Sequence, residues 1–181
     1  SAVEFNLYSV NTSPEASSAG VEDRYLRIIS MVRAQIEVPL AVKLSQHITG
    51  LSSFARRAED AGANGLVLFN RFYGAEVDLD GLAMTSRLAL SNPEELRFPL
   101  RWIGILRAQR PGLSLAATTG VHSGLDAVKA LLVGADVACT TSAVLQHGTG
   151  RVGRMLAELG TWLTDHDYDS VRQLQGSMSA D

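Results

Sequence analysis

Five short apolar runs, separated by amphipathic segments, constrain the fold of this chain more than any other feature of its sequence. The runs are rich in Val, Leu and Ala, which is typical of strands buried in a parallel sheet, and they cover residues 3–10, 39–44, 65–70, 113–118 and 136–141. Apolar residues with helical spacing lie between or after them, in segments 21–36, 51–61, 125–132 and 152–163. The pattern predicts repeated strand–helix units of an α/β fold.

Two of the predicted helices end in the same short motif. Gly62-Ala63-Asn64 precedes the third apolar run, and Gly134-Ala135-Asp136 leads into the fifth. Glycine readily adopts the left-handed conformation that ends a helix before a tight turn into a strand. The motif therefore supports a βα repeat.

An eight-stranded barrel explains these units better than a small doubly wound domain does. The chain begins within a strand, and the last two strands are followed by small hydroxylated residues, as in barrel phosphate sites. A closed barrel typically needs roughly 200 residues or more. We therefore expect residues 1–181 to form one domain with about the last five βα units of a (β/α)8 TIM barrel. Segment 71–101 does not continue the alternation of strands and helices. We expect it to be an insertion at a strand's carboxyl end, where α/β enzymes place binding loops.

Composition excludes several classes of function. The net charge is −3 with both signs interspersed, which argues against nucleic acid as a partner. No apolar run approaches the ~20 residues of a membrane helix, and no signal peptide is recognisable. The single cysteine, Cys139, cannot form an internal disulfide, so a cytoplasmic location is expected.

Two loops carry residues suited to a phosphate group. Thr119 and Gly120 follow the fourth run, and Thr141 and Ser142 follow the fifth. Backbone N–H groups, hydroxyls and a close glycine together favour phosphate binding. Ordinary turns, with Ser123 or Ser142 as a helix cap, are the alternative for either loop alone. Two such loops after consecutive strands favour the phosphate interpretation.

Lys43 and three asparagines are further candidates for ligand binding. The chain has 16 basic residues but Lys only at 43 and 129, and Lys43 ends the second run, where its ammonium would face the barrel mouth. Asn6 and Asn70 lie in or at the end of apolar runs, where asparagine is depleted. Their amides can donate to and accept from a ring with carbonyl and N–H groups. Asn11 is equally well explained as a turn residue. The four histidines show no metal-ligand spacing, and we expect surface or loop positions for them and no metal site.

In combination these motifs resemble the dihydroorotate dehydrogenase family, and especially its dihydroorotate dehydrogenase-like branch. The resemblance rests on segments 4–6, 42–44, 118–121 and 141–143, on the near-signature strings 65–73 and 100–103, and on the tail segments 168–171 and 176–178. It covers essentially the whole chain but only the last five of the family's eight strands.

The resemblance implies an FMN-dependent oxidoreductase of pyrimidine biosynthesis that acts on dihydroorotate or a related dihydropyrimidine. It implies that Lys43 contacts the isoalloxazine ring, and that Thr119, Gly120, Thr141 and Ser142 hold the FMN phosphate. It further implies that Asn6, Asn11 and Asn70 bind the substrate ring. Ser9 falls where the family has its catalytic base, although the surrounding string Tyr8-Ser9-Val10-Asn11 departs from the usual Ser-Cys-Pro-Asn.

Three alternatives stay open at this point. The chain could belong to a flavin enzyme of the same fold with another substrate, to a lyase or isomerase barrel without flavin, or to a non-catalytic binding subunit. We also expect a barrel that lacks strands to expose unpaired edges, and therefore to form homo-oligomers or to associate with the missing barrel half. The fragment alone is expected to be inactive.

Overall fold

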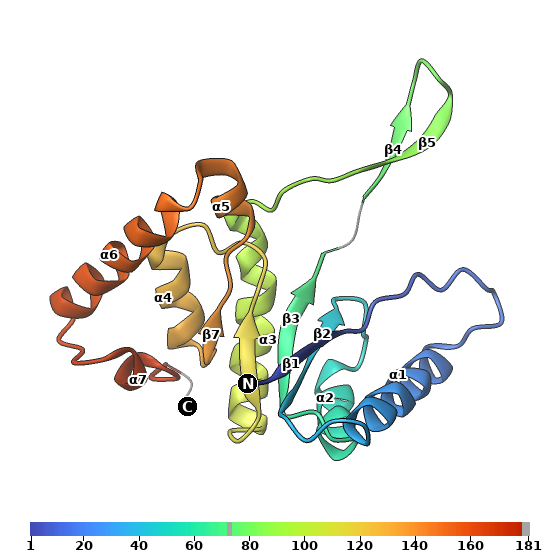
Figure 1. Cartoon of the computed structure of the whole chain (residues 1–181), viewed down its shortest axis with the longest axis horizontal. Helices are drawn as coiled ribbons and strands as arrows, with labels where there is room; N and C mark the ends of the chain where they lie inside the picture. Colours follow the sequence, from blue (N-terminus) through green and yellow to red (C-terminus); the bar gives the residue numbers. More distant parts are fainter. Residues whose placement is uncertain (72–73, 179–181) are drawn as a thin grey trace.

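The computed structural model describes residues 1–71 and 74–178 and has a mixed α/β fold built on a parallel sheet (Figure 1). The strands lie in the order β1-β2-β3-β6-β7, with each neighbouring pair parallel. Their bounds are β1 Val3–Asn6, β2 Leu40–Ser45, β3 Gly65–Asn70, β6 Ser114–Ala117 and β7 Val137–Ala138. Each predicted apolar run thus coincides with a strand to within a few residues, and the prediction of a mixed α/β fold with a parallel sheet is confirmed.

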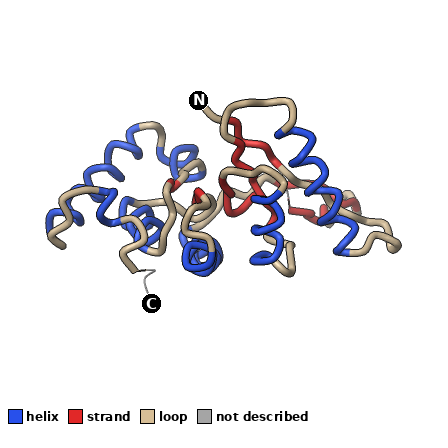
Figure 2. The backbone as a smooth tube through the Cα atoms, turned by 90° about the horizontal axis from the view of Figure 1, so that it is seen from below, coloured by secondary structure: helices blue, strands red, loops and turns tan. Residues whose placement is uncertain are grey.

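Helices follow the strands, as the helical spacing predicts. The connecting helices are α1 Ser18–Arg33, α2 Leu51–Asp60, α3 Arg97–Gln109 and α4 Gly124–Leu132, and the chain continues with α5 Ser142–His147, α6 Gly150–Asp165 and α7 Val171–Leu174. In Figure 2 the strands occupy the middle of an elongated molecule and helices extend to both sides of them. No helix of the described residues is long and apolar enough to cross a membrane.

The two edge strands are shorter than the apolar runs predict. β1 ends at Asn6 and β7 at Ala138, and the runs continue from there as loops. Both strands lie at an edge of the sheet, where hydrogen bonds to a neighbouring strand are available on one side only.

The two faces of the sheet differ in burial. On the face covered by helices, strand side chains pack against Ile29, Phe54 and Ile103 from α1, α2 and α3, and none of the following is more than 1% exposed: Leu40, Val42, Leu44, Leu66, Leu68, Leu115 and Ala117. On the opposite face Val67 is buried, but other side chains are partly or fully exposed: Asn6, Ala41, Lys43 and Ala116. The helix-covered face is therefore the core, and the other face stays open.

The two Gly-Ala turns have the predicted conformation, with φ of +107° at Gly62 and +111° at Gly134. The residue that closes each turn makes two hydrogen bonds to the preceding strand in the sheet. The Asn64 N–H donates to Leu40 O (2.7 Å), and Asn64 Oδ1 accepts from Leu40 N (2.8 Å). Asp136 binds Leu115 in the same way, at 2.7 and 2.8 Å. The two turns therefore set the start of β3 and of β7.

An arginine packs beneath each of these turns. A Cβ atom added to Gly62 would overlap the Arg33 side chain, and one added to Gly134 would lie 2.5 Å from Arg107 Cγ. Arg107 also donates to Gly134 O (2.8 Å) and forms an ion pair with Asp136 (2.6 Å). Both space and backbone conformation therefore require glycine at these turns.

The insertion predicted at 71–101 contains a hairpin that the sequence interpretation did not anticipate. β4 Gly74–Asp78 and β5 Ala83–Arg87 form a separate antiparallel pair, which projects away from the sheet at the upper right of Figure 1. The short 3-10 helix Pro93–Leu96 then leads into α3. Phe72 and Tyr73, part of the signature string 65–73, lie outside the described residues.

Replacing Gly134 should destabilise the fold. We expect Gly134→Ala to lower the free energy of unfolding by about 2 kcal/mol or more, because alanine is strained at this φ and its methyl group displaces Arg107. Gly112→Ala is the matched control, since a Cβ there meets nothing within 4 Å, and it should change stability by less than about 0.5 kcal/mol. Urea unfolding of both variants measures the difference. Equal stabilities would contradict the role assigned to the turn.

Candidate functional site

A pocket of about 310 Å³ lies at the carboxyl ends of the strands β2, β3, β6 and β7; we call it the carboxyl-end pocket. It contains all five residues that the sequence predicts for cofactor binding: Lys43, Thr119, Gly120, Thr141 and Ser142. Asn70, a predicted substrate ligand, lines the same pocket. The structure thus brings together residues from four separate strand ends.

Lys43 lies on the open face of the sheet. Its Cα is in register with those of Asn6 on β1 and Val67 on β3. Its ammonium group lies 3.4 Å from the carboxylate of Glu4, and its side chain is one-quarter exposed (25%). Sequence reasoning did not single out Glu4, because an exposed acidic residue in an edge strand carries no distinctive signal.

Asn6 and Asn70 are in direct contact. Asn70 Nδ2 donates to Asn6 Oδ1 at 2.5 Å, which links β1 to β3 across the intervening β2. This bond uses one donor and one acceptor, so the Asn6 amide N–H groups and the Asn70 oxygen remain able to bind a ligand. The pair is suited to a ring that carries both carbonyl and N–H groups.

The loop after β6 has an unusual backbone conformation. Thr119 and Gly120 are both left-handed, with φ of 79° and 82°. A β-branched residue rarely adopts this conformation, and such strain gathers at functional sites. A Cβ on Gly120 would overlap the backbone of Leu96, so only glycine fits. Among the described residues the N–H groups of Gly120 and Val121 have no hydrogen-bond acceptor, which makes both available to an anion.

Ser91 connects the two predicted phosphate loops. Its N–H donates to Ser142 Oγ at 2.9 Å, and its own hydroxyl lies 3.0 Å from His122 Nε2. Because Ser142 Oγ accepts this bond, its proton is free to be donated to a ligand. His122 lies in a loop, as expected, but it is buried, and the sequence pattern gave no signal for its contact with Ser91.

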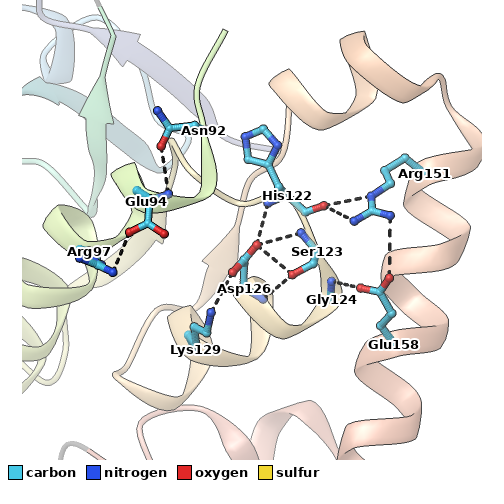
Figure 3. Close-up of polar contacts among 10 residues, drawn as sticks. All are labelled: Asn92, Glu94, Arg97, His122, Ser123, Gly124, Asp126, Lys129, Arg151 and Glu158. Carbon is cyan, nitrogen blue, oxygen red and sulfur yellow. Dashed lines mark hydrogen bonds and ion pairs between the residues drawn. The ribbon is translucent and has the colours of Figure 1, made fainter.

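Figure 3 shows the network that holds the segment after Gly120. Ser123 caps α4, and the buried Asp126 accepts hydrogen bonds from the N–H groups of His122 (3.2 Å) and Ser123 (3.0 Å). From α6, Arg151 donates two hydrogen bonds to the His122 carbonyl, and Glu158 accepts from Gly124 N at 2.6 Å. The capping role considered for Ser123 is therefore correct, and it fixes one side of the carboxyl-end pocket.

Two ionisable groups near the pocket have shifted pKa values. Burial alone would raise the pKa of Asp126, but hydrogen bonds from Lys129, Ser123 and the His122 N–H outweigh it and hold the pKa below its usual value. Burial raises the pKa of the Cys139 thiol; Glu4 raises it further and Lys43 opposes this. Cys139, which also lines the pocket, is therefore a thiol near neutral pH.

Ser9 and Asn11 lie outside the carboxyl-end pocket. They line a different pocket of about 240 Å³ beside α1, and in Figure 1 their loop runs from β1 toward α1, away from β6 and β7. Ser9 Oγ lies 2.6 Å from Tyr25 Oη and accepts from Arg24 (3.1 Å) and Asn11 Nδ2 (3.2 Å). With both acceptor positions occupied, the Ser9 proton is directed to Tyr25.

No group of three or more His, Cys, Asp or Glu side chains is placed to hold a metal ion within residues 1–71 and 74–178. The donors of the carboxyl-end pocket are instead hydroxyls, amides, backbone N–H groups, the Lys43 ammonium and the Arg71 guanidinium. Such a set suits a phosphorylated organic ligand.

Comparison with known proteins adds independent information. No family model matches the chain. The catalytic subunit of dihydroorotate dehydrogenase B (NAD(+)) from Citrifermentans bemidjiense is 30% identical over 156 residues, which cover 83% of this chain and 50% of the relative. The subunit of the same name from Geobacter sulfurreducens is 28% identical over 183 residues (98% and 59%), and dihydroorotate dehydrogenase A (fumarate) from Limosilactobacillus reuteri is 29% identical over 144 residues (75% and 45%). The chain spans about half the length of these curated relatives.

The depressed pKa of Asp126 predicts a pH-dependent contribution to stability. Its stabilisation is fully present above the unfolded-state pKa of about 3.9 and is lost as the pH falls through the lower folded-state pKa. We expect Asp126→Asn to lower the free energy of unfolding by about 1–3 kcal/mol at neutral pH, and the difference from wild type to shrink below about pH 4. Urea unfolding across a pH series measures this.

The matched control for this prediction is Asp165→Asn, which alters an exposed carboxylate without an ion pair among the described residues. It should leave stability unchanged within about 0.5 kcal/mol. A constant difference between Asp126→Asn and wild type down to strongly acidic pH would show that the charge of Asp126 is not what stabilises the loop.

Proposed function

Because this chain is related to the dihydroorotate dehydrogenases, we propose that it is the C-terminal portion of an FMN-dependent oxidoreductase of pyrimidine biosynthesis. Its substrate would be dihydroorotate or a related dihydropyrimidine. One observation carries the proposal: Lys43 and both phosphate-type loops line a single pocket.

The residues of the carboxyl-end pocket fit FMN. The free N–H groups of Gly120 and Val121 and the hydroxyl of Ser142 would hold the phosphate, together with Thr119 and Thr141. Lys43 would contact the isoalloxazine ring. When bound, FMN supplies the hydride acceptor of the reaction.

The chain's own residues would orient the reactants and balance charge. The Lys43 ammonium offsets negative charge that develops on the ring, and Glu4 keeps it at this position. Asn6 and Asn70 hold the substrate ring through the donors and acceptors left free by their mutual bond. Buried Ser91 and His122 fix the pocket wall without touching the substrate.

Ser9 is proposed as the base that removes a substrate proton. A serine is a weak base unaided, so it needs a proton relay; Tyr25 Oη, 2.6 Å away, would take the Ser9 proton as it passes its own phenolic proton to water in the pocket beside α1. Arg24, which donates to Ser9 Oγ, favours the deprotonated form. To contact the substrate, Ser9 Oγ would have to lose one of the two hydrogen bonds that it accepts. The bond from Asn11 is easier to lose than the bond from Arg24, because Asn11 is neutral.

The open face of the sheet and the free edges of β1 and β7 support a partial (β/α)8 barrel of one domain. The chain spans about half the length of the curated relatives that it matches, which leaves room in them for the other strands of such a barrel. We propose that the chain associates with the missing barrel half or with further copies of itself in the cytoplasm, and that it is inactive alone.

A flavin enzyme of the same fold with another substrate is the second candidate. The observation that favours it is the position of Ser9 and Asn11, which line a different pocket from Asn70. This candidate keeps the FMN site and changes only the molecule oxidised.

Comparison of FMN with riboflavin tests the phosphate site without requiring turnover. We expect Ser142→Ala to weaken FMN binding about 10-fold or more, because a hydrogen bond to a charged phosphate is lost, and to leave riboflavin binding unchanged. Ser53→Ala, an exposed hydroxyl on α2, should change neither affinity. Flavin fluorescence titration measures both. Equal loss of the two flavins would place the phosphate elsewhere, and no flavin binding in the protein with its upstream strands would refute the cofactor.

Substitution of Ser9 tests the base. In protein that includes the rest of the barrel, we expect Ser9→Ala to slow anaerobic bleaching of the flavin by dihydroorotate about 100-fold or more with flavin affinity unchanged, and Ser9→Cys to retain activity. Tyr25→Phe should give an intermediate loss. An unchanged rate of bleaching in Ser9→Ala would show that Ser9 is not the base. Flavin that stays oxidised in the wild type would instead favour a flavin enzyme with another substrate.

A further inference from the structure

The buried polar residues of the described chain gather beside the carboxyl-end pocket. Ser45, Ser91, His122 and Asp126 are the polar or charged residues buried within residues 1–71 and 74–178, and the last three are joined by hydrogen bonds. We propose that His122 is a positioning residue for the phosphate of the bound ligand: its imidazolium donates to Ser91 Oγ, and the Ser91 hydroxyl donates to the phosphate. The inference rests on the phosphorylated ligand of the proposed function.

The Ser91 hydroxyl lies among the groups proposed to hold the phosphate. Ser91 lines the carboxyl-end pocket, and its N–H donates to Ser142 Oγ at 2.9 Å. Val121, whose N–H is free, lines the same pocket and directly precedes His122. His122 itself is not part of the pocket lining. The ring therefore stands behind Ser91 and acts on a ligand through it.

The hydrogen bond between Ser91 Oγ and His122 Nε2, 3.0 Å apart, can run in either direction. When Nε2 carries no proton, the Ser91 hydroxyl donates to it and has no proton left for a ligand. When Nε2 is protonated, it donates to Ser91 Oγ and leaves the hydroxyl proton for the pocket. Of the ring forms with this proton, the imidazolium is also positively charged, and a nearby phosphate dianion favours it.

The backbone of His122 is held from two sides. Asp126 accepts from its N–H at 3.2 Å, and Arg151 donates to its carbonyl at 3.0 and 2.6 Å. In Figure 3 both partners bind the backbone, and the imidazole ring points away from them. The ring is therefore left to Ser91, and its backbone is fixed for that contact.

The charged groups around His122 and in the pocket already have partners of opposite sign. The pairs near His122 lie on α4, on α6 and at the start of α3, and those of the pocket involve its two cations; they are Asp126–Lys129, Arg151–Glu158, Glu94–Arg97, Arg71–Glu95 and Lys43–Glu4. A phosphate dianion thus meets no cation lining the described pocket that is free of an acidic partner. Protonation of His122, with a proton taken from solvent, supplies one.

Proton uptake on binding tests the inference, because a merely structural role of His122 would not produce it. Calorimetric titrations in two buffers of different ionisation enthalpy measure the uptake, in protein that includes the rest of the barrel. The pH is set to about 7.5, where a phosphate monoester is largely a dianion. We expect FMN to bind with uptake of roughly half a proton or more, and riboflavin, which lacks the phosphate, with none.

Substitutions assign this proton. His122→Gln should abolish the uptake and weaken FMN binding about 10-fold, with riboflavin binding unchanged. His166→Gln, the same substitution at an exposed histidine after α6, is the matched control and should leave both as in the wild type. Ser91→Ala removes the hydroxyl but keeps the N–H that binds Ser142, and it should also abolish the uptake. Retained riboflavin binding shows that a variant is folded.

The pH dependence gives a second measurement. Because binding favours the protonated ring, the preference of the wild type for FMN over riboflavin should fall as the pH rises from about 7 to about 9. In His122→Gln this preference should stay constant, since the phosphate remains a dianion over this range.

The possible failures can be told apart. FMN binding without proton uptake, or with equal uptake in the wild type and His122→Gln, would overturn the role of His122 and leave the FMN site in place. If His122→Gln loses riboflavin as well, Ser91→Ala decides, and undiminished uptake there would overturn the role. A wild type that binds no FMN would refute the proposed function, and this inference with it.

Discussion

The paired hydrogen bonds made by Asn64 and Asp136 are the interactions on which the rest of the structure depends. Each residue closes a left-handed glycine turn and binds both backbone polar groups of one residue in the neighbouring strand. In a parallel sheet a slip of one residue would exchange the two faces. By setting where β3 and β7 begin, these bonds put leucines among the helices and leave Lys43 on the open face. The carboxyl-end pocket is a consequence of that register.

The pocket is largely formed before any ligand enters. Asp126, Arg151 and Glu158 hold the backbone from His122 to Gly124, so the strained, left-handed Thr119 and Gly120 are followed by a fixed segment. Groups that are already ordered lose little conformational entropy on binding. The strain at Thr119 is thus balanced by hydrogen bonds several residues away along the chain.

Sequence patterns predicted those features that depend on neighbours along the chain. The apolar runs, the helical stripes and the glycines at 62 and 134 each have a local signal. The arrangement of the site depends on contacts across long stretches of chain: Asn6 and Asn70 are 64 residues apart, and Ser9 meets Tyr25 through a loop whose path the sequence does not specify. The hairpin was missed because its apolar residues are few and are mixed with acidic ones, and Ser91 was missed because a serine before a helix is ordinarily only a turn residue.

Ser91 connects the carboxyl-end pocket to the base of the hairpin. Its backbone and side chain contact the two phosphate-type loops, and only three residues separate it from the end of β5. If a molecule in the pocket favours one position of Ser91, it also favours the position of the hairpin base that goes with it. A change at the hairpin base affects binding in the pocket to the same extent. Occupancy of the pocket and the position of the hairpin base are therefore linked through a single buried serine.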